Sequence, residues 1–282
     1  TARLINSGIK FKLNCEIGSE ISFKDLQQRH DAILIATGVY KSRKTNLEHN
    51  ASNVISAIDF LTASNRKGLK DRVTNFENGK LNCKNKNVIV IGGGDTAMDC
   101  VRTAIRQEAK SVKCLYRRDQ KNMPGSQREV LNAIEEGIEF QWLSLPTNYC
   151  GTKEINSVEV IKMQLGISDE SGRRNPEKIP KSNYQINTDM IIEALGFEPE
   201  NLPIIFDEPN LQVTNWGTLK INYKTMMTNI KGVFAAGDIV RGASLVVWGI
   251  KDGRDAANQI HLYLSTKNNT NFSKNGNDKN EK

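Results

Sequence analysis

The chain has 282 residues, of which 38% are hydrophobic, and a formal net charge of +7. This length and apolar content suffice for one large core or two modest ones. No apolar run approaches the roughly 20 residues that span a bilayer, and no basic start followed by an apolar stretch resembles a signal peptide. We therefore expect a cytoplasmic protein without a membrane span. The first residue is Thr1 rather than Met, so the start was processed or the sequence is part of a longer chain.

Basic residues are scattered among acidic ones, and only 6% of the residues are aromatic. A nucleic-acid site needs basic residues that cluster or alternate with aromatic ones, so we expect none. The five cysteines form no C-x-x-C pair, which argues against a redox-active disulfide, a zinc ribbon or an iron–sulfur cluster within this chain. The three histidines are isolated, so we expect no metal site.

The first part of the chain predicts a strand, a helix and a second strand. Residues 8–14 (GIKFKLN) alternate apolar and polar side chains, which is typical of a half-buried strand. Residues 23–31 predict a short helix that begins after Ser22 as its N-cap. The continuous apolar run over 32–38 (AILIATG) predicts a fully buried strand.

The middle of the chain predicts a strand–helix–strand unit preceded by a domain boundary. Residues 56–65 predict a helix, and the polar stretch 77–87 predicts the boundary. Residues 88–116 predict a strand, a tight turn, an amphipathic helix and a second strand. A second helix over 126–137 ends at a glycine, and a strand over 138–146 ends at a proline.

The last part of the chain returns to short strands and closes with a helix. Strand-like pieces separated by polar turns over 158–185 predict an antiparallel meander. Residues 189–200 and 231–240 each contain a buried strand, and residues 244–264 predict a long helix. The tail over 266–282 is polar and of low complexity, which predicts disorder.

The turn after the strand at 88–91 carries the pattern Gly92-x-Gly94-x-x-Ala97. Between a strand and a helix, this pattern is the dinucleotide-binding fingerprint. Gly92 permits the tight turn, Gly94 lets a pyrophosphate approach the backbone, and Ala97 lets the helix pack on the strand. The amides at the helix N-terminus can bind phosphate. The alternative is a glycine-rich turn that binds no ligand.

The second strand of this unit ends in Tyr116-Arg117-Arg118. An NAD site places Asp or Glu here, where the carboxylate accepts a hydrogen bond from the ribose 2′-hydroxyl. No carboxylate stands here to repel a 2′-phosphate, and arginine can bind that phosphate through paired, charge-assisted hydrogen bonds. The pattern favours NADP(H) over NAD(H). The alternative is that the two arginines are only surface charge.

Other predicted strands end in glycine and suggest a second nucleotide site. Residues 36–38 and 194–196 each end in glycine, and residues 228–238 end in Gly-Asp. A carboxylate at the carboxyl end of a sheet, such as that of Asp238, can accept hydrogen bonds from cofactor hydroxyls. The next helix begins near 244–246, where its amides can face a flavin ring and stabilise negative charge on it.

Several stretches carry a resemblance that covers nearly the whole chain except the polar tail: GGGDTAMDCVRTAIRQ, YRRD, NMPGS, EVLNAIEEG and GVFAAGDIVRGASLVVW. They resemble the small-subunit family of NADPH-dependent glutamate synthase, whose members are similar to pyridine nucleotide-disulfide oxidoreductases. The resemblance implies an α/β fold with two Rossmann-like dinucleotide-binding domains, the NADP domain being inserted into the FAD domain. The implied division is the first part of an incomplete FAD domain at 1–80, the NADP domain at 84–200, the closing part of the FAD domain at 201–265 and a disordered tail at 266–282.

The resemblance also implies site residues for two cofactors, NADPH and FAD. Those implied for FAD are Ala36, Thr37, Gly38, Gly237, Asp238, Leu245 and Val246, with a backbone contact from Ile17. Those implied for NADPH are Gly92, Gly94, Asp95, Thr96, Arg117 and Arg118. The resemblance implies no catalytic side chain, because hydride transfer from nicotinamide to flavin needs no protein acid or base.

The sequence departs from the family in what precedes Thr1. Family members carry an earlier glycine-rich strand–turn–helix for the FAD pyrophosphate, and cysteines for iron–sulfur clusters. Without that strand the FAD sheet would have unpaired edges. We therefore expect an amino-terminally truncated flavoprotein, or the product of a split or decaying gene, whose missing FAD loop a separate chain could supply.

The function implied is that of an NADPH-dependent flavin oxidoreductase subunit of the glutamate synthase type. Its expected partner is the glutamate synthase large subunit or another electron-accepting subunit. One alternative is a non-catalytic NADP(H)-binding module or gene remnant. Chemistry like that of thioredoxin reductase is disfavoured, because no C-x-x-C pair is present.

Overall fold

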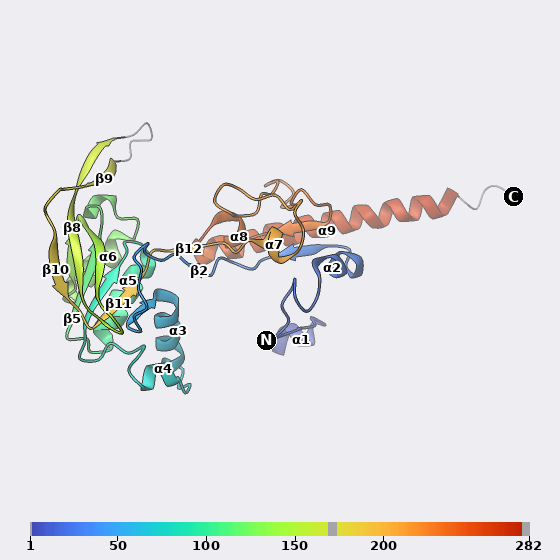
Figure 1. The fold of residues 1–282 in the computed structure, drawn as a ribbon. Helices are drawn as coiled ribbons and strands as arrows, with labels where there is room; N and C mark the ends of the chain where they lie inside the picture. The colour runs from blue at the N-terminus through green and yellow to red at the C-terminus, as the bar shows by residue number, and fades with distance from the viewer. Residues whose placement is uncertain (1, 169–173, 278–282) are drawn as a thin grey trace. The chain divides into compact units, whose positions relative to one another are not determined.

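The computed structural model describes residues 2–168 and 174–277 (Figure 1). The chain divides into two compact units. One, which we call the discontinuous unit, comprises Thr1–Lys41 and Phe197–Lys282; the other, the inserted unit, comprises Ser42–Gly196. In sequence, the inserted unit stands between the two segments of the discontinuous unit. The inserted unit begins at Ser42 rather than at residue 84.

The earlier start of the inserted unit follows from its central sheet. This sheet is parallel, with strand order β3-β11-β4-β5-β6. The edge strand β3 pairs with β11, so the segment before the expected boundary is part of the sheet. The strands are β3 (Val54–Ser56), β4 (Asn87–Ile91), β5 (Ser111–Tyr116), β6 (Glu139–Trp142) and β11 (Met190–Glu193).

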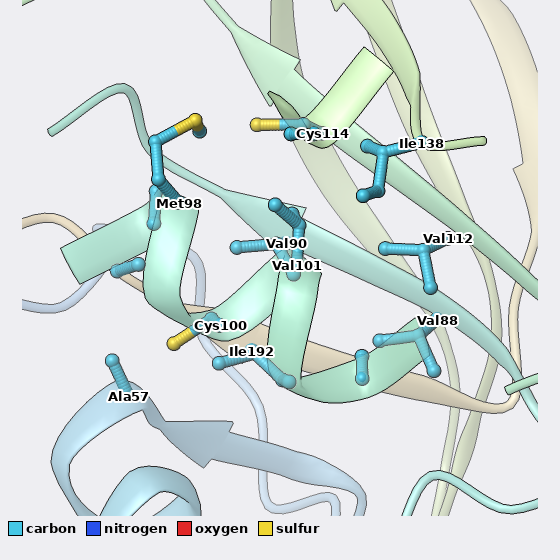
Figure 2. Close-up of a cluster of buried hydrophobic side chains, with 14 of the residues drawn as sticks. Ala57, Val88, Val90, Met98, Cys100, Val101, Val112, Cys114, Ile138 and Ile192 are labelled. Atoms are coloured by element: carbon cyan, nitrogen blue, oxygen red, sulfur yellow. The ribbon is translucent and has the colours of Figure 1, made fainter. Parts of the chain in front are cut away.

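Helices cover one face of this sheet. The fingerprint helix α5 buries a continuous face that includes Ala97, Val101 and Ala104, as its 3.6-residue periodicity predicts. Figure 2 shows Val101 lying against Val88 and Val90 of β4. The helical elements are α3 (Ala57–Gly68), α4 (Thr74–Glu77), α5 (Asp95–Arg106), a 3-10 turn η1 (Gln120–Asn122) and α6 (Gln127–Glu135).

The antiparallel meander covers the opposite face, which confirms the prediction for 158–185. Ile89 of β4 points away from α5 and packs with Val158 and Val160 of the meander. Burial on both faces explains why β4 is an uninterrupted apolar run. The strands are β7 (Ser144–Gly151), β8 (Ile155–Ser168), β9 (Arg174–Lys178) and β10 (Tyr184–Asn187). Residues 169–173, the first part of a polar turn expected in this meander, lie outside the described residues.

The discontinuous unit contains a parallel pair, β1 (Ile33–Ile35) and β13 (Val233–Ala235). Helix α2 (Phe23–Arg29) begins as predicted, because the Asp25 amide donates to the Ser22 hydroxyl at 3.0 Å. Phe23 then stacks on Phe206 with ring centroids 4.9 Å apart. Other elements are α1 (Ala2–Asn6), α7 (Leu202–Ile205), α8 (Asp238–Arg241), α9 (Val246–Asn277) and a separate short pair, β2 (Lys41–Ser42) with β12 (Phe197–Glu198).

Two expectations for this unit were wrong. Residues 8–14 form no strand, and the side chain of Leu13 is 76% exposed. Alternating polarity stabilises a strand only where another strand pairs with it, and no described strand pairs with these residues. The disorder expected over 266–282 is replaced by helix as far as Asn277, where α9 continues without a break. Residues 278–282 lie outside the description. None of the described helices is both long and apolar enough to cross a membrane.

Candidate functional site

The turn between β4 and α5 has three glycines, and neighbouring atoms require glycine at two of these positions. Gly92 has φ +151°, and a Cβ there would lie 2.2 Å from the carbonyl oxygen of Ala194. A Cβ on Gly93 would lie 2.4 Å from the ring of Tyr116. Gly94 differs, because its φ is −92° and a Cβ would meet no protein atom within 4 Å. The space beside Gly94 is therefore open to a ligand.

The loop after β5 supports this turn from outside. The amide of Gly125 donates to the carbonyl of Gly93 at 2.9 Å. The amide of Ser126 donates to the Asp95 carboxylate at 2.8 Å. Asp95, which the resemblance placed in the NADPH site, thus anchors the NMPGS loop and does not line the cavity beside Gly94.

The open space is part of a cavity of about 840 Å³ at the carboxyl ends of β4, β5 and β11. Ligands bind at this edge in parallel α/β sheets. Five of the residues that the resemblance implied for NADPH line it: Gly92, Gly94, Thr96, Arg117 and Arg118. Further cations that the sequence did not single out also line it: Arg43, Lys44 and Lys178. No Asp or Glu is among the described residues that line this cavity.

Arg118 lines this cavity, and its main chain is held in place. Its backbone carbonyl accepts from the amide of Leu143 at 3.0 Å. Its Nε atom is buried, and no hydrogen-bond partner for it exists among the described residues. A guanidinium carries several N–H donors, so the remaining donors of Arg118 can serve an anionic ligand.

A buried carboxylate fixes the part of the cavity wall that residues 43–47 form. Glu193, which is 5% exposed, accepts a hydrogen bond from the Thr45 hydroxyl at 2.5 Å and another from the Tyr149 hydroxyl at 2.9 Å. Burial raises the pKa of Tyr149, so this hydroxyl remains a donor. Glu193 thereby fixes the loop that carries Arg43 and Lys44. No local motif marks this loop, which explains why sequence reasoning missed it.

A second cavity, of about 520 Å³, lies in the discontinuous unit at the carboxyl ends of β1 and β13. It brings together most of the residues implied for FAD: Ala36, Gly38, Gly237, Asp238, Leu245 and Val246. Thr37 is exposed and does not line it. Ile17, for which a backbone contact was implied, is not among the residues that line it, and its side chain packs against the core of this unit.

An ion pair fixes the turn that forms this second cavity. Arg241 donates to the Asp252 carboxylate at 2.5 and 2.7 Å, and Asp252 is 2% exposed. This hydrogen bonding holds the pKa of Asp252 below its usual value. The Arg241 guanidinium also lies over the Trp248 ring, 5.0 Å from its centroid. The Ser244 hydroxyl donates to Asp238 at 2.8 Å, so both ends of the turn are held.

The chain belongs to the pyridine nucleotide-disulphide oxidoreductase family, whose model matches residues 5–253. Within that class it is 54% identical over 265 residues to the glutamate synthase [NADPH] small chain of Azospirillum brasilense, covering 94% of this chain and 55% of that one. It is 39% identical over 265 residues to the corresponding small chain of Escherichia coli K12, with coverage of 91% and 55%. The chain thus spans about half the length of these relatives.

The fold is shared with a solved structure. Mycobacterium tuberculosis FprA aligns with a TM-score of 0.73 at 16% sequence identity, covering 91% of this chain and 69% of that one. At that identity the likeness concerns the fold alone. It agrees with the expected α/β architecture built on parallel sheets.

Substituting Gly94 separates ligand binding from folding. We expect Gly94→Val to lower the affinity for a pyridine dinucleotide at least tenfold, which is about 1.4 kcal/mol, because its side chain enters the cavity. The unfolding free energy should fall by only about 1 kcal/mol, since valine is a poorer N-cap than glycine but meets no clash here. Titration with NADPH and NADH, together with urea unfolding, measures both quantities.

The matched control is Gly92→Val. Its side chain would clash with the Ala194 carbonyl, so it should lower the unfolding free energy by more than about 2 kcal/mol. Normal dinucleotide binding by Gly94→Val would contradict the assignment of the cavity.

The Arg241–Asp252 pair should make stability depend on acid pH. Because the folded-state pKa of Asp252 is lowered, its contribution is present above the unfolded pKa of about 3.9 and is lost as the pH falls through the folded pKa. Asp252→Asn should lower the unfolding free energy by about 2 kcal/mol at pH 7, and less under acid conditions. Urea unfolding across this pH range measures the effect.

Asp255→Asn, which removes an exposed pair with Lys251, is the control and should change stability by under about 0.5 kcal/mol. Equal losses in both variants would refute the role of Asp252.

Proposed function

We propose that this chain is an NADPH-dependent flavin oxidoreductase subunit of the glutamate synthase small-chain type. The observation that carries the proposal is the cavity at the carboxyl ends of β4, β5 and β11, which we call the first cavity. It combines the fingerprint turn with basic side chains, and no described carboxylate lines it. The names of the relatives in A. brasilense and E. coli support the choice of NADPH.

The inserted unit fits NADPH by shape and charge. Space beside Gly94 admits a pyrophosphate, and the amides at the start of α5 can donate to it. Arg117 and Arg118 follow β5, where a 2′-phosphate on the adenosine ribose would lie. An NAD site would need a carboxylate at this point, and none of the described lining residues provides one.

The discontinuous unit fits part of FAD. Asp238 stands at the carboxyl end of β13, where its carboxylate can accept from cofactor hydroxyls. Leu245 and Val246 are 62% and 76% exposed and can cover an apolar ring. We propose that the FAD pyrophosphate is bound by residues outside this sequence, in the same polypeptide or in a separate chain.

NADPH supplies a hydride, and FAD accepts it, when both are bound. The residues of this chain hold and orient the two cofactors, and no protein side chain needs to transfer a proton in this step. Arg241 and Asp252 hold the turn beside the proposed flavin site, and Glu193 holds the wall of the NADPH site.

The electrons would pass to the glutamate synthase large subunit or to another electron-accepting subunit. The description of the relatives as small chains supports a larger partner. We place this activity in the cytoplasm, where the five free cysteines would remain reduced.

The proposal is tested by visible absorption of the purified chain after incubation with FAD. A bound flavin spectrum that bleaches when NADPH is added without oxygen would mean that the FAD residues of this chain suffice for hydride transfer. NADPH binding without flavin binding would mean that this chain alone is an NADP(H)-binding module and that FAD binding needs the residues outside this sequence.

Replacing both Arg117 and Arg118 by alanine tests the choice of nucleotide. Each arginine can make charge-assisted hydrogen bonds worth roughly 1.5–3 kcal/mol, so we expect the NADPH affinity to fall about 100-fold or more. The NADH affinity should change by less than about threefold, because NADH lacks the 2′-phosphate. Fluorescence titration measures both affinities. An equal loss for NADPH and NADH would reject the assignment.

A further inference from the structure

We propose that Lys178 is a third cation for the 2′-phosphate of NADPH and thereby a determinant of nucleotide specificity. This inference rests on the proposed function of the first cavity. Lys178 lies on β9, more than fifty residues after the arginines that follow β5, and yet it lines the same cavity.

A continuous series of backbone contacts joins Lys178 to Arg118. The Leu143 amide donates to the Arg118 carbonyl at 3.0 Å, and the Met163 amide donates to the Leu143 carbonyl at 2.7 Å. Met163 on β8 is in turn the direct partner of Lys178 in the β8–β9 register. The meander thus places Lys178 on the β5 side of the cavity.

Lys178 is the last residue of β9 and lines the cavity beside its buried partner Met163. Residues that are direct partners on neighbouring strands share a face of the sheet, and Met163, the partner of Lys178, is only 4% exposed. The preceding residue, Glu177, pairs with Gln164 on the other face, where the two side chains lie 3.4 Å apart. The stem of Lys178 can cover Met163 while its ammonium reaches the cavity.

The positive charges of Lys178, Arg117 and Arg118 are not balanced by a carboxylate in the described part of the chain. No ion pair joins Lys178, Arg117 or Arg118 to a carboxylate among the described residues. A phosphate monoester carries nearly two negative charges at neutral pH. Arginine binds such a group by a planar fork, and lysine adds a point charge that needs less exact alignment.

The remaining cations of the cavity lie on its other side. The Arg43 amide donates to the Gly196 carbonyl at 3.0 Å, just after β11. Strands β11 and β5 flank β4 on opposite sides, so the loop with Arg43 and Lys44 is separated from Lys178 by the glycine turn. Lys178 therefore belongs with the arginines after β5.

The test uses the adenosine half of the nucleotide with and without its 2′-phosphate, so that flavin is not needed. Binding of 2′,5′-ADP and 5′-ADP is measured by calorimetry for the wild-type chain and for Lys178→Ala, Lys178→Arg and the Arg117→Ala/Arg118→Ala double variant. We expect Lys178→Ala to weaken 2′,5′-ADP about 10-fold and 5′-ADP less than twofold. Lys178→Arg should retain most of the affinity.

Lys162→Ala is the matched control. Lys162 precedes Met163 on β8, carries the same charge as Lys178 and does not line the cavity. It should leave both affinities unchanged. A loss in Lys162→Ala equal to that in Lys178→Ala would indicate a general charge effect and overturn the proposal.

Two failures can be told apart. If the arginine variant loses 2′,5′-ADP while Lys178→Ala binds it like the wild type, the role of Lys178 is refuted and the NADPH site stands. If the wild type binds 2′,5′-ADP no better than 5′-ADP, the proposed NADPH function itself fails, and the inference about Lys178 fails with it.

Discussion

The approach of Gly92 to the carbonyl of Ala194 is the constraint on which the nucleotide cavity depends. The fingerprint turn can leave β4 and enter α5 only if no side chain stands between it and the end of β11. Strand β11 arrives about one hundred residues later in sequence and lies directly beside β4. This contact therefore couples a local motif to the topology of the whole sheet, and it opens the carboxyl edge where Gly94 faces the cavity.

Coverage of both sheet faces decides which residues surround that opening. Helix α5 packs on one face and the meander on the other, so β4 is apolar and buried from Val88 to Ile91. The meander also carries Tyr149, which bonds to the buried Glu193, and Lys178, which lines the cavity. The meander thus supplies a supporting hydrogen bond and a charged residue to a cavity whose glycine motif lies between β4 and α5.

This division explains what could be predicted from the sequence. The turn at Gly92 and Gly94 and the arginine pair after β5 were recognisable, because they belong to one continuous strand–turn–helix–strand unit. Lys178 and the loop with Arg43 and Lys44 carry no local pattern, and only tertiary pairing brings them to the cavity.

Partners that are distant in sequence also modify what local patterns predict. Asp95 follows the glycine turn directly, and its carboxylate accepts a hydrogen bond from the amide of Ser126. Residues 8–14 alternate like a strand but lack a described partner strand. In both cases the local pattern gives the polarity of the side chains, and the presence or absence of a partner from elsewhere in the chain decides their role.

The two cavities differ in charge, and this difference bears on which nucleotide each one binds. The first is lined by arginines and lysines without a described carboxylate. The second has Asp238 as the charged residue among those described, beside apolar residues such as Leu34, Leu245 and Ile250. A 2′-phosphate in the second cavity would face Asp238 with no cation among the described lining residues to balance it, at a cost that rises as water is excluded. Charge alone therefore favours the phosphorylated dinucleotide in the inserted unit and the flavin nucleotide, which has only its pyrophosphate, in the discontinuous one.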